Sequence, residues 1–599
     1  MRRIVLTAVA ALWVAWLIVA AMFYPVGGDE AGYAYSMLAI ARGKLPVLDM
    51  FILQPPDFYI PFAAVARWLS PSLEAMRLVS VASIVAVTAM VAALAHQRYG
   101  SRAGLLAFVL IGLSHVWFYW NVQVIHYPVA NFCLVGAFYL VERRRPDRRD
   151  LFLAGFAAGW LGATRLVLGP AAVALLAVAV IRAQPAGRRQ AIGAAMVFCL
   201  GGLIAALPLL AVLAADPQAT VFDLLRARAR LEYEGHMGSP TGVKMVVDFL
   251  SSHLGVLWGF FFWFDTTLKA QYINIAFLVL GAAAAVGFAR APTSAPRRAF
   301  LADPVVRHSA VLAAVVVLAH FATIILPYYI QAVLPLMALT VCAALYHAGL
   351  LPAAPEARVP AWMRAVLAVS LVPYVAVFLG WTTVHALRRN EPSSARPQVA
   401  AQVGCWVEEN TAAGDTIMSF AALPAVYADR RLPDGMEYNN ATAQLAWMPG
   451  LDEATAARYR LVSADTLAAR LRAGTIAVLV DDKNLDQEPW AQSITAAIAA
   501  NYRTVATTGG AFPYVIKVRN DLWRETLPRF DAPAPSRVGV HDVGLANLGW
   551  LARLGGETAA MAATLPGDLA DALARLRHAP FEDRCRRYLR LKTAGEPLK

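Results

Sequence analysis

Charged residues are scarce in this chain. Asp, Glu, Lys and Arg make up 16% of its 599 residues, whereas hydrophobic residues make up 59%. A soluble globular protein normally carries about 25% charged residues, because its surface must face water. The composition therefore excludes an ordinary soluble enzyme. Apolar segments of roughly 20 residues recur along the chain, and that length spans a bilayer as a helix. The chain is predicted to be a polytopic membrane protein.

Motifs for zinc binding and for dithiol redox chemistry are also missing. The five cysteines form no CxxC pair and show no zinc-type spacing. Cys133, Cys199 and Cys342 lie in apolar segments, where we expect buried small side chains. Cys405 and Cys585 lie in the polar part, and a disulfide between them stays open. The sequence therefore indicates no certain cofactor, and it leaves open whether a divalent metal ion takes part.

The excess of basic residues indicates membrane topology rather than a nucleic-acid partner. The net charge is +13, but the arginines fall mainly in short loops between apolar segments, as the positive-inside rule requires of cytoplasmic loops. Gly155 and Gly159, on one of these segments, have the spacing of closely packed helices. The candidate spans cover residues 4–24, 72–95, 104–120, 125–141, 151–168, 169–183, 191–214, 246–264, 272–289, 309–326, 329–348 and 364–387.

The charges of the loops predict which side of the membrane each loop faces. If all twelve segments crossed, the basic loop 290–308 and the loop holding Arg358 would face outward, against the positive-inside rule. Segment 246–264 contains Asp248, so we interpret it as a broken or interfacial helix. The prediction is eleven spans, or thirteen if a further helix is split. The N-terminus then lies in the cytoplasm and residues 390–599 lie outside it.

The chain divides into a membrane domain over residues 1–389, a soluble domain over 390–520 and a helical tail over 521–599. Two long loops of the membrane domain, 25–71 and 215–245, are expected on the outer side. Alternating helices and strands indicate a small α/β fold for the soluble domain. Its helices are expected at 399–410, 463–473 and 492–500, and its strands at 416–420, 475–480 and 514–518.

The first external loop holds the candidate catalytic residues. Asp29 and Glu30 directly follow the first apolar segment, and Asp49 lies further along the same loop. Taken alone, Asp29 fits the N-cap of a helix expected over 31–41, and Asp49 fits a turn; a second helix is expected over 55–68. Taken together, carboxylate groups placed where lipid gives way to water favour a general base or a metal-positioning group that acts on an acceptor hydroxyl.

The order of these residues resembles the integral-membrane glycosyltransferases of the GT-C type. The pattern runs from Asp29-Glu-Ala-Gly-Tyr33 through Gly43-x-x-Pro46-x-x-Asp49 to Pro55-Pro-x-x-Tyr59, and on to Arg77-Leu78. It is most similar to the protein O-mannosyltransferase-like group, which includes the bacterial lipid A aminoarabinose transferases and the rhizobial lipopolysaccharide sugar transferases.

This resemblance implies a GT-C fold with about 11–13 transmembrane helices and a small C-terminal α/β domain. It implies a multi-pass enzyme of the bacterial inner membrane, whose active site and soluble domain face the periplasm. The donor would be a sugar on polyprenyl phosphate, and the acceptor a hydroxyl of an envelope glycolipid, polysaccharide or protein. Asp29 would deprotonate or orient this hydroxyl for inverting attack, with Glu30 and Asp49 in the same catalytic group.

Positive charge must stabilise the departing lipid phosphate, since an anion that develops in a low-dielectric cleft needs fixed cations. Arg165 is one candidate, because an arginine among apolar residues is costly and usually functional, although snorkelling at a helix end also explains it. Gln54 stands where the aminoarabinose transferases carry lysine, so a phosphate contact there would be neutral, which counts against aminoarabinose as the sugar. The other candidates lie in the second external loop: Arg226, Arg228, Arg230, His236 and Lys244.

Aromatic and polar side chains are the candidates for binding the sugar or the acceptor. Packing alone would also explain His126, and an aromatic belt at the membrane interface would explain Tyr328 and Tyr329 equally well. The full set is Tyr33, Tyr59, His126, Tyr328, Tyr329 and Gln331.

Two other functions compete with sugar transfer. A transporter or flippase of a lipid-linked sugar would place charge near the bilayer midplane and often show repeated halves, whereas here the acidic residues gather in an external loop and the sequence shows no internal repeat. A scaffold or sensor would not need eleven spans for anchoring. The sequence therefore favours a transferase, while the sugar, the acceptor and the polyprenol length stay open.

Overall fold

The computed structural model describes residues 2–26, 29–144, 146–227, 275–321, 331–354, 356–387, 397–420, 422–438, 453–481, 491–508 and 513–522. The chain forms two compact units. Unit 1 comprises Met1–Leu53, Tyr59–Val79 and His385–Lys599, and unit 2 comprises Gln54–Phe58 and Ser80–Val384.

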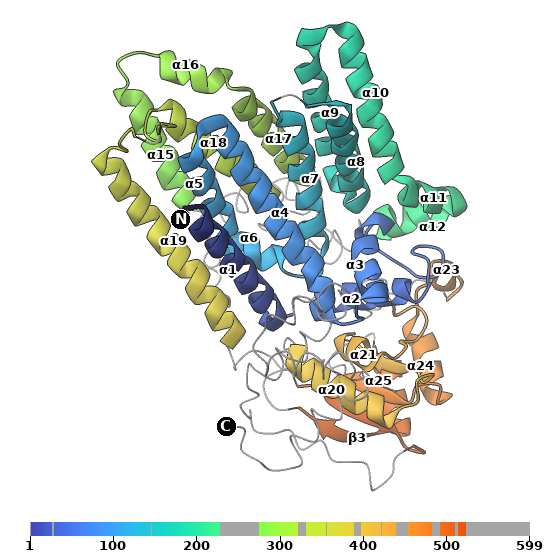
Figure 1. Ribbon diagram of the computed structural model, residues 1–599. Helices are drawn as coiled ribbons and strands as arrows, with labels where there is room; N and C mark the ends of the chain where they lie inside the picture. The colour runs from blue at the N-terminus through green and yellow to red at the C-terminus, as the bar shows by residue number, and fades with distance from the viewer. Residues whose placement is uncertain are drawn as a thin grey trace, which may run out of the picture. The chain divides into compact units, whose positions relative to one another are not determined.

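Unit 2 consists of helices that follow the apolar segments of the sequence, and α7 to α10 lie side by side in it (Figure 1). Its described helices are α5 (Ser101–Gly112), α6 (His115–Asn121), α7 (His126–Glu142), α8 (Arg148–Thr164), α9 (Gly169–Ala183), α10 (Arg188–Ala205), α11 (Leu207–Ala215), α12 (Pro217–Val221), α15 (Ile275–Arg290), α16 (Ala295–Ala302), α17 (Pro304–Phe321) and α18 (Leu334–His347). Helices α4 (Leu73–Tyr99) and α19 (Ala361–Leu387) each begin or end in unit 1.

Among the described residues, three helical stretches are long and apolar enough to cross a membrane unaided: Leu73–Tyr99, Leu166–Ala186 and Ala361–Gly380. Three more candidates are helix pairs bent by 54°, 57° and 57°, namely α5 with α6, α10 with α11 and α16 with α17. The predicted segment 246–264 lies outside the described residues, so the total of eleven spans stays a prediction.

Two segments that the sequence indicates as single spans are bent, and local chemistry explains where. Ser114 caps α6 by accepting a hydrogen bond from the backbone N–H of Trp117 at 3.2 Å, which starts a new helix inside the predicted span 104–120. Pro208 lies in the first turn of α11, inside the predicted span 191–214. Proline has no N–H to continue the preceding helix, but it fits the start of the next one.

The glycines of α8 bring it into backbone contact with α10. A Cβ atom added at Gly155 would lie 1.9 Å from the carbonyl oxygen of Phe198, and one at Gly159 would lie 2.2 Å from that of Gly202. Only glycine permits such an approach, and the packing expected from the spacing of Gly155 and Gly159 is confirmed.

Unit 1 combines the first helix and the first loop with the C-terminal domain. It contains α1 (Arg2–Phe23), α2 (Glu30–Ala41) and most of α3 (Pro56–Trp68), and both loop helices begin where the sequence predicts. The C-terminal elements are α20 (Pro397–Asn410), β1 (Ile417–Ser419), α21 (Leu423–Ala428), α23 (Glu453–Arg458), α24 (Ala464–Arg472), β2 (Val478–Asp481), α25 (Gln492–Asn501), β3 (Tyr502–Thr507) and β4 (Val515–Arg519).

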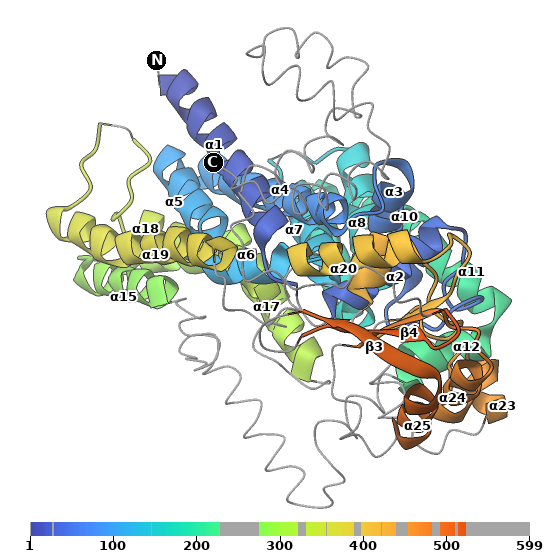
Figure 2. The same ribbon diagram turned by 90° about the horizontal axis from the view of Figure 1, so that it is seen from below.

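The described strands form one sheet in the order β1-β2-β4-β3. Buried strand β2 pairs in parallel with β1, with Leu479 opposite Met418, and antiparallel with β4, with Val480 opposite Ile516. Strand β3, beside β4 in Figure 2, was not predicted from the sequence. It is an edge strand with half its residues exposed, so it lacks the continuous apolar run that identifies β2. A mainly helical protein with a small C-terminal sheet is confirmed.

Helix α21 of the C-terminal domain lies against α2 of the first loop (Figure 1). Beside this contact, the Tyr427 hydroxyl donates a hydrogen bond of 2.7 Å to the carboxylate of Glu74, at the start of α4, and both groups are buried. Helix α2, which directly follows the predicted catalytic residue Asp29, is therefore packed against the C-terminal domain.

The close packing of α8 and α10 predicts a sharp difference between two glycine-to-alanine substitutions. Gly155→Ala should lower the thermal unfolding midpoint in detergent, because the added methyl group forces the helices apart at a cost of about 1–3 kcal/mol. Gly193→Ala on α10 is the control, since its Cβ would meet nothing within 4 Å. Equal midpoints for the two variants would contradict the contact.

Candidate functional site

Asp29 lies directly before α2 and exposes its side chain. Its backbone is already helical, with φ −82° and ψ −26°, and its carboxylate makes no capping hydrogen bond to the helix. Asp29 therefore lies at the expected N-cap position, but its side chain does not make the hydrogen bond typical of an N-cap. The carbonyl oxygen of Asp29 accepts a hydrogen bond of 3.1 Å from the N–H of Tyr33, which places Tyr33 one turn further along α2.

Glu30 has a different environment from its neighbour, because it forms a buried ion pair with Arg77. Both residues are fully buried. The Nε and Nη2 groups of Arg77 donate to the two carboxylate oxygens of Glu30 at 2.7 and 2.6 Å. Arg77 also donates to the carbonyl oxygens of Ala21 and Tyr24 at 2.6 and 2.7 Å. This pair fixes the start of α2, and with it the position of Asp29.

An aromatic cluster stands beside Asp29. The ring of Tyr33 lies edge-on to that of Tyr59, at 6.3 Å between centroids, and to that of Tyr438, at 6.0 Å. Phe51 lies edge-on to Tyr438 at 5.5 Å. Burial raises the pKa of Tyr438 well above its ordinary value, and the neighbouring Tyr33, Tyr59 and Asp29 raise it further. The phenol of Tyr438 therefore stays protonated across the physiological range.

Sequence reasoning found Tyr33 and Tyr59 in this cluster but missed Tyr438. Tyr438 belongs to the C-terminal domain, hundreds of residues along the chain from its partners. No local pattern around it indicates a site, since only the folding of that domain onto α2 brings it there.

Asp49 is exposed and closes a turn of the loop. Its carboxylate accepts a hydrogen bond of 2.8 Å from the N–H of Leu45, and its own N–H donates to the carbonyl oxygen of Leu45 at 2.8 Å. Its described interactions thus shape the loop between α2 and α3.

A second cluster in unit 2 brings together two residues that the sequence indicated separately. Arg165 ends α8 and is 1% exposed. Its Nη1 lies 2.7 Å from Nε2 of His126, and its guanidinium lies over the ring of Tyr127 at 4.8 Å. Because a guanidinium only donates, Nε2 of His126 is the acceptor. The ring of His126 also contacts Phe58, at 6.1 Å between centroids.

The remaining predicted residues of unit 2 are placed as follows. Gln54 is buried. The side-chain oxygen of Gln331 accepts a hydrogen bond of 2.8 Å from Asn121, which in turn accepts one of 2.8 Å from Asn131, so Gln331 belongs to a buried amide network. Arg226 is exposed on a π-helical turn at Phe222–Ala227. Outside the described residues lie Arg228, Arg230, His236, Lys244, Tyr328 and Tyr329.

Asp57, at the start of α3, is a buried acid that sequence reasoning did not select as a site residue. It is 1% exposed, and neither carboxylate oxygen has a hydrogen-bond partner within the part of the chain that the structure describes. Burial raises its pKa to about 7. Asp57 is therefore substantially protonated at neutral pH.

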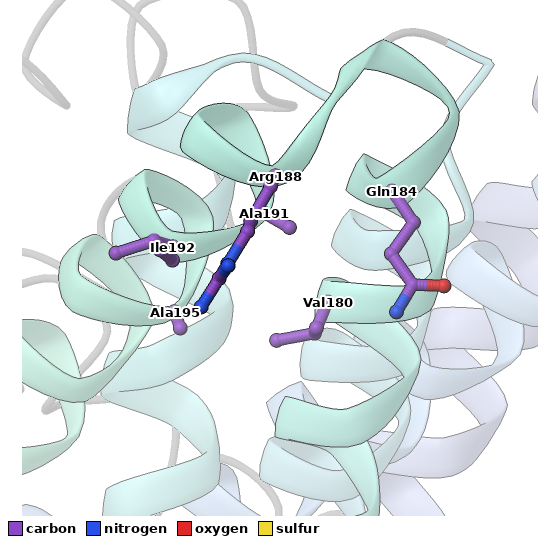
Figure 3. A pocket seen from close by; sticks show the side chains of 6 residues that line it. All are labelled: Val180, Gln184, Arg188, Ala191, Ile192 and Ala195. Carbon is purple, nitrogen blue, oxygen red and sulfur yellow. The ribbon is translucent and has the colours of Figure 1, made fainter.

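A cavity of about 520 Å³ lies between the adjoining ends of α9 and α10, lined by Val180, Gln184, Arg188, Ala191, Ile192 and Ala195 (Figure 3). Helix α9 has 15 residues, so at 1.5 Å per residue its two ends are about 20 Å apart. Arg165 precedes the other end of α9, and the cavity is thus remote from the Arg165 cluster. Among the described residues, no group of three or more His, Cys, Asp or Glu side chains gathers as a metal site.

Comparison with known proteins gives matches of structure only. No protein-family model and no curated protein matches the chain. The structure of ArnT from Cupriavidus metallidurans bound to undecaprenyl phosphate matches with a TM-score of 0.56 and 14% identity, covering 88% of this chain and 98% of ArnT. The apo state of the same protein matches with a TM-score of 0.54 and 15% identity, covering 86% and 97%. At this identity the likeness shows the fold alone, and the chain has the GT-C fold of the integral-membrane glycosyltransferases that its first-loop motif predicted.

Proposed function

We propose that this protein transfers a sugar from a polyprenyl phosphate to a hydroxyl of an envelope glycolipid, polysaccharide or protein, on the extracytoplasmic side of the membrane. The observation that carries the proposal is the exposed carboxylate of Asp29, held at the start of α2 by the buried pair of Glu30 and Arg77. The undecaprenyl phosphate bound to ArnT, whose fold this chain shares, supports a lipid-linked donor.

Asp29 acts as the general base in this proposal. The acceptor oxygen forms a bond to the anomeric carbon of the sugar, while the bond from that carbon to the phosphate oxygen breaks, and the configuration inverts. The acceptor proton passes to Asp29, and the polyprenyl phosphate leaves with the bonding electrons. Tyr33 and Tyr59 belong to the aromatic cluster of unit 1, whose Tyr438 also lies near Asp29, and we assign them to acceptor or sugar binding.

Arg165 is the cation assigned to the departing phosphate. Its charge is buried, where an ionic interaction is stronger than in water, and its contacts with His126 and Tyr127 hold the guanidinium in one orientation. Gln54 contributes a neutral polar group. Preorganised donors of this kind are typically the largest source of stabilisation for a developing anion.

Asp29→Asn should reduce transfer by about 10²–10⁴-fold, because it removes the proton acceptor but keeps the size of the side chain. Mass spectrometry of envelope glycoconjugates from a host that lacks the chain, complemented with each variant, measures the product. Binding of undecaprenyl phosphate, followed by thermal shift, should not change. Wild-type product from Asp29→Asn would remove Asp29 from the base role.

Glu30→Gln tests whether the carboxylate next to Asp29 has a structural role instead. Breaking a buried ion pair leaves an uncompensated charge and costs about 3–5 kcal/mol, so this variant should lower the thermal midpoint and the yield of folded protein. Its transfer rate per folded molecule should exceed that of Asp29→Asn. The reverse order of rates would assign the base role to Glu30.

Arg165→Gln should weaken binding of undecaprenyl phosphate at least tenfold, or about 1.4 kcal/mol, because a buried cation is lost. Arg188→Gln is the matched control, since Arg188 lines the cavity at the remote end of α9. Microscale thermophoresis with the purified full chain compares the two. Equal affinities would refute a phosphate role for Arg165.

A further inference from the structure

We propose that the C-terminal domain is part of the catalytic site, with Tyr438 as the positioning residue through which it holds Tyr33 and Asp29 in place. The proposal rests on the proposed transferase function and extends it, because it makes sugar transfer depend on a domain whose sequence shows no catalytic motif. Four features of unit 1 support it.

The first feature is a pair of hydrogen bonds between α2 and the segment that leads to Tyr438. The hydroxyl of Tyr35 accepts a hydrogen bond of 2.6 Å from the N–H of Leu432, and the hydroxyl of Ser36 donates one of 2.7 Å to the carbonyl oxygen of Glu437. All four residues are buried. The backbone is thus held at two points of the segment, the second of them directly before Tyr438.

The second feature is a charged link at the same place. Lys44, which follows α2, forms ion pairs with Glu437 and, at 2.8 Å, with Asp434. The other carboxylate oxygen of Glu437 accepts the N–H of Gly435 at 2.8 Å. Gly435 has φ +91°, and a Cβ there would lie 2.9 Å from the backbone nitrogen of Val462. The turn before Tyr438 therefore has one defined shape.

The third feature is the packing of Tyr438 itself. Its ring lies edge-on to two rings of the first loop, Tyr33 at 6.0 Å and Phe51 at 5.5 Å. Edge-to-face pairs of this kind contribute about 0.5–1.5 kcal/mol each beyond simple burial. Tyr438 is 8% exposed, so its role is to hold its neighbours in place rather than to present a wide surface to the substrate.

The fourth feature is the route from Tyr438 to the proposed base. Tyr33 is tied through its backbone N–H to the carbonyl oxygen of Asp29 at 3.1 Å. The packing of Tyr438 against Tyr33 thus restrains the turn of α2 that also carries Asp29. Misplacing a catalytic group by about 1 Å can cost about 100-fold in rate.

The test compares two buried tyrosines of the same domain. Tyr438→Ala removes the ring from the cluster, whereas Tyr502→Ala removes a ring from edge strand β3, where the hydroxyl of Tyr502 donates to Ile476 at 2.7 Å. Both variants should lower the thermal midpoint of the full-length protein. At a temperature where both stay folded, Tyr438→Ala should lower kcat about 10- to 100-fold, with undecaprenyl phosphate binding unchanged, and Tyr502→Ala should keep the wild-type kcat.

Tyr438→Phe keeps both edge contacts and loses only the hydroxyl group beside Tyr33, so its kcat should lie well above that of Tyr438→Ala. A kcat for Tyr438→Ala equal to that of Tyr502→Ala would overturn the inference and leave the proposed function intact. Wild-type protein that transfers no sugar from any polyprenyl phosphate would overturn both.

Discussion

One buried ion pair sets the geometry on which the proposed site depends. Arg77 uses its Nε, Nη1 and Nη2 groups together, toward Glu30 and toward the carbonyl oxygens of Ala21, Tyr24 and Pro25. A guanidinium is tolerated away from water only when its donors are satisfied, because desolvation costs several kcal/mol. The carbonyl groups lie at the end of α1, the carboxylate starts α2, and Arg77 belongs to α4. A single side chain therefore joins three helices.

The same pair separates the roles of two adjacent carboxylate groups. Successive residues of a helix point about 100° apart, so the rotation of α2 that buries Glu30 turns Asp29 out of that contact. In the proposed mechanism the base must reach the acceptor, and exposed Asp29 is better placed for this than Glu30, whose carboxylate Arg77 encloses. From the sequence, both residues were predicted to be catalytic. Their positions along the chain do not indicate which of them forms the ion pair with Arg77.

Features set by residues close together in the sequence could be predicted, whereas contacts between residues far apart in the sequence could not. The starts of α2 and α3 follow from local signals, namely an acidic pair and a double proline, and hydropathy located the helices of unit 2. The contact between Arg165 and His126 depends on how α7 and α8 pack, so each residue was selected but their pairing was not. Tyr438 carries no local signal, since its partners lie in the first loop.

The first loop owes its shape to the C-terminal domain as much as to its own sequence. Ten of the twelve residues of α2 are buried, whereas a helix that lies on a membrane surface buries one face and leaves the other in water. Helix α2 therefore needs packing partners on nearly every side. Helix α21 and the segment before Tyr438 supply part of them. The predicted boundary between the membrane domain and the soluble domain lies at residue 390, but contacts of α2 with residues beyond it cross this boundary. Most of the motif that the sequence assigns to the membrane domain thus lies in unit 1, together with the described residues 397–420 and 422–438.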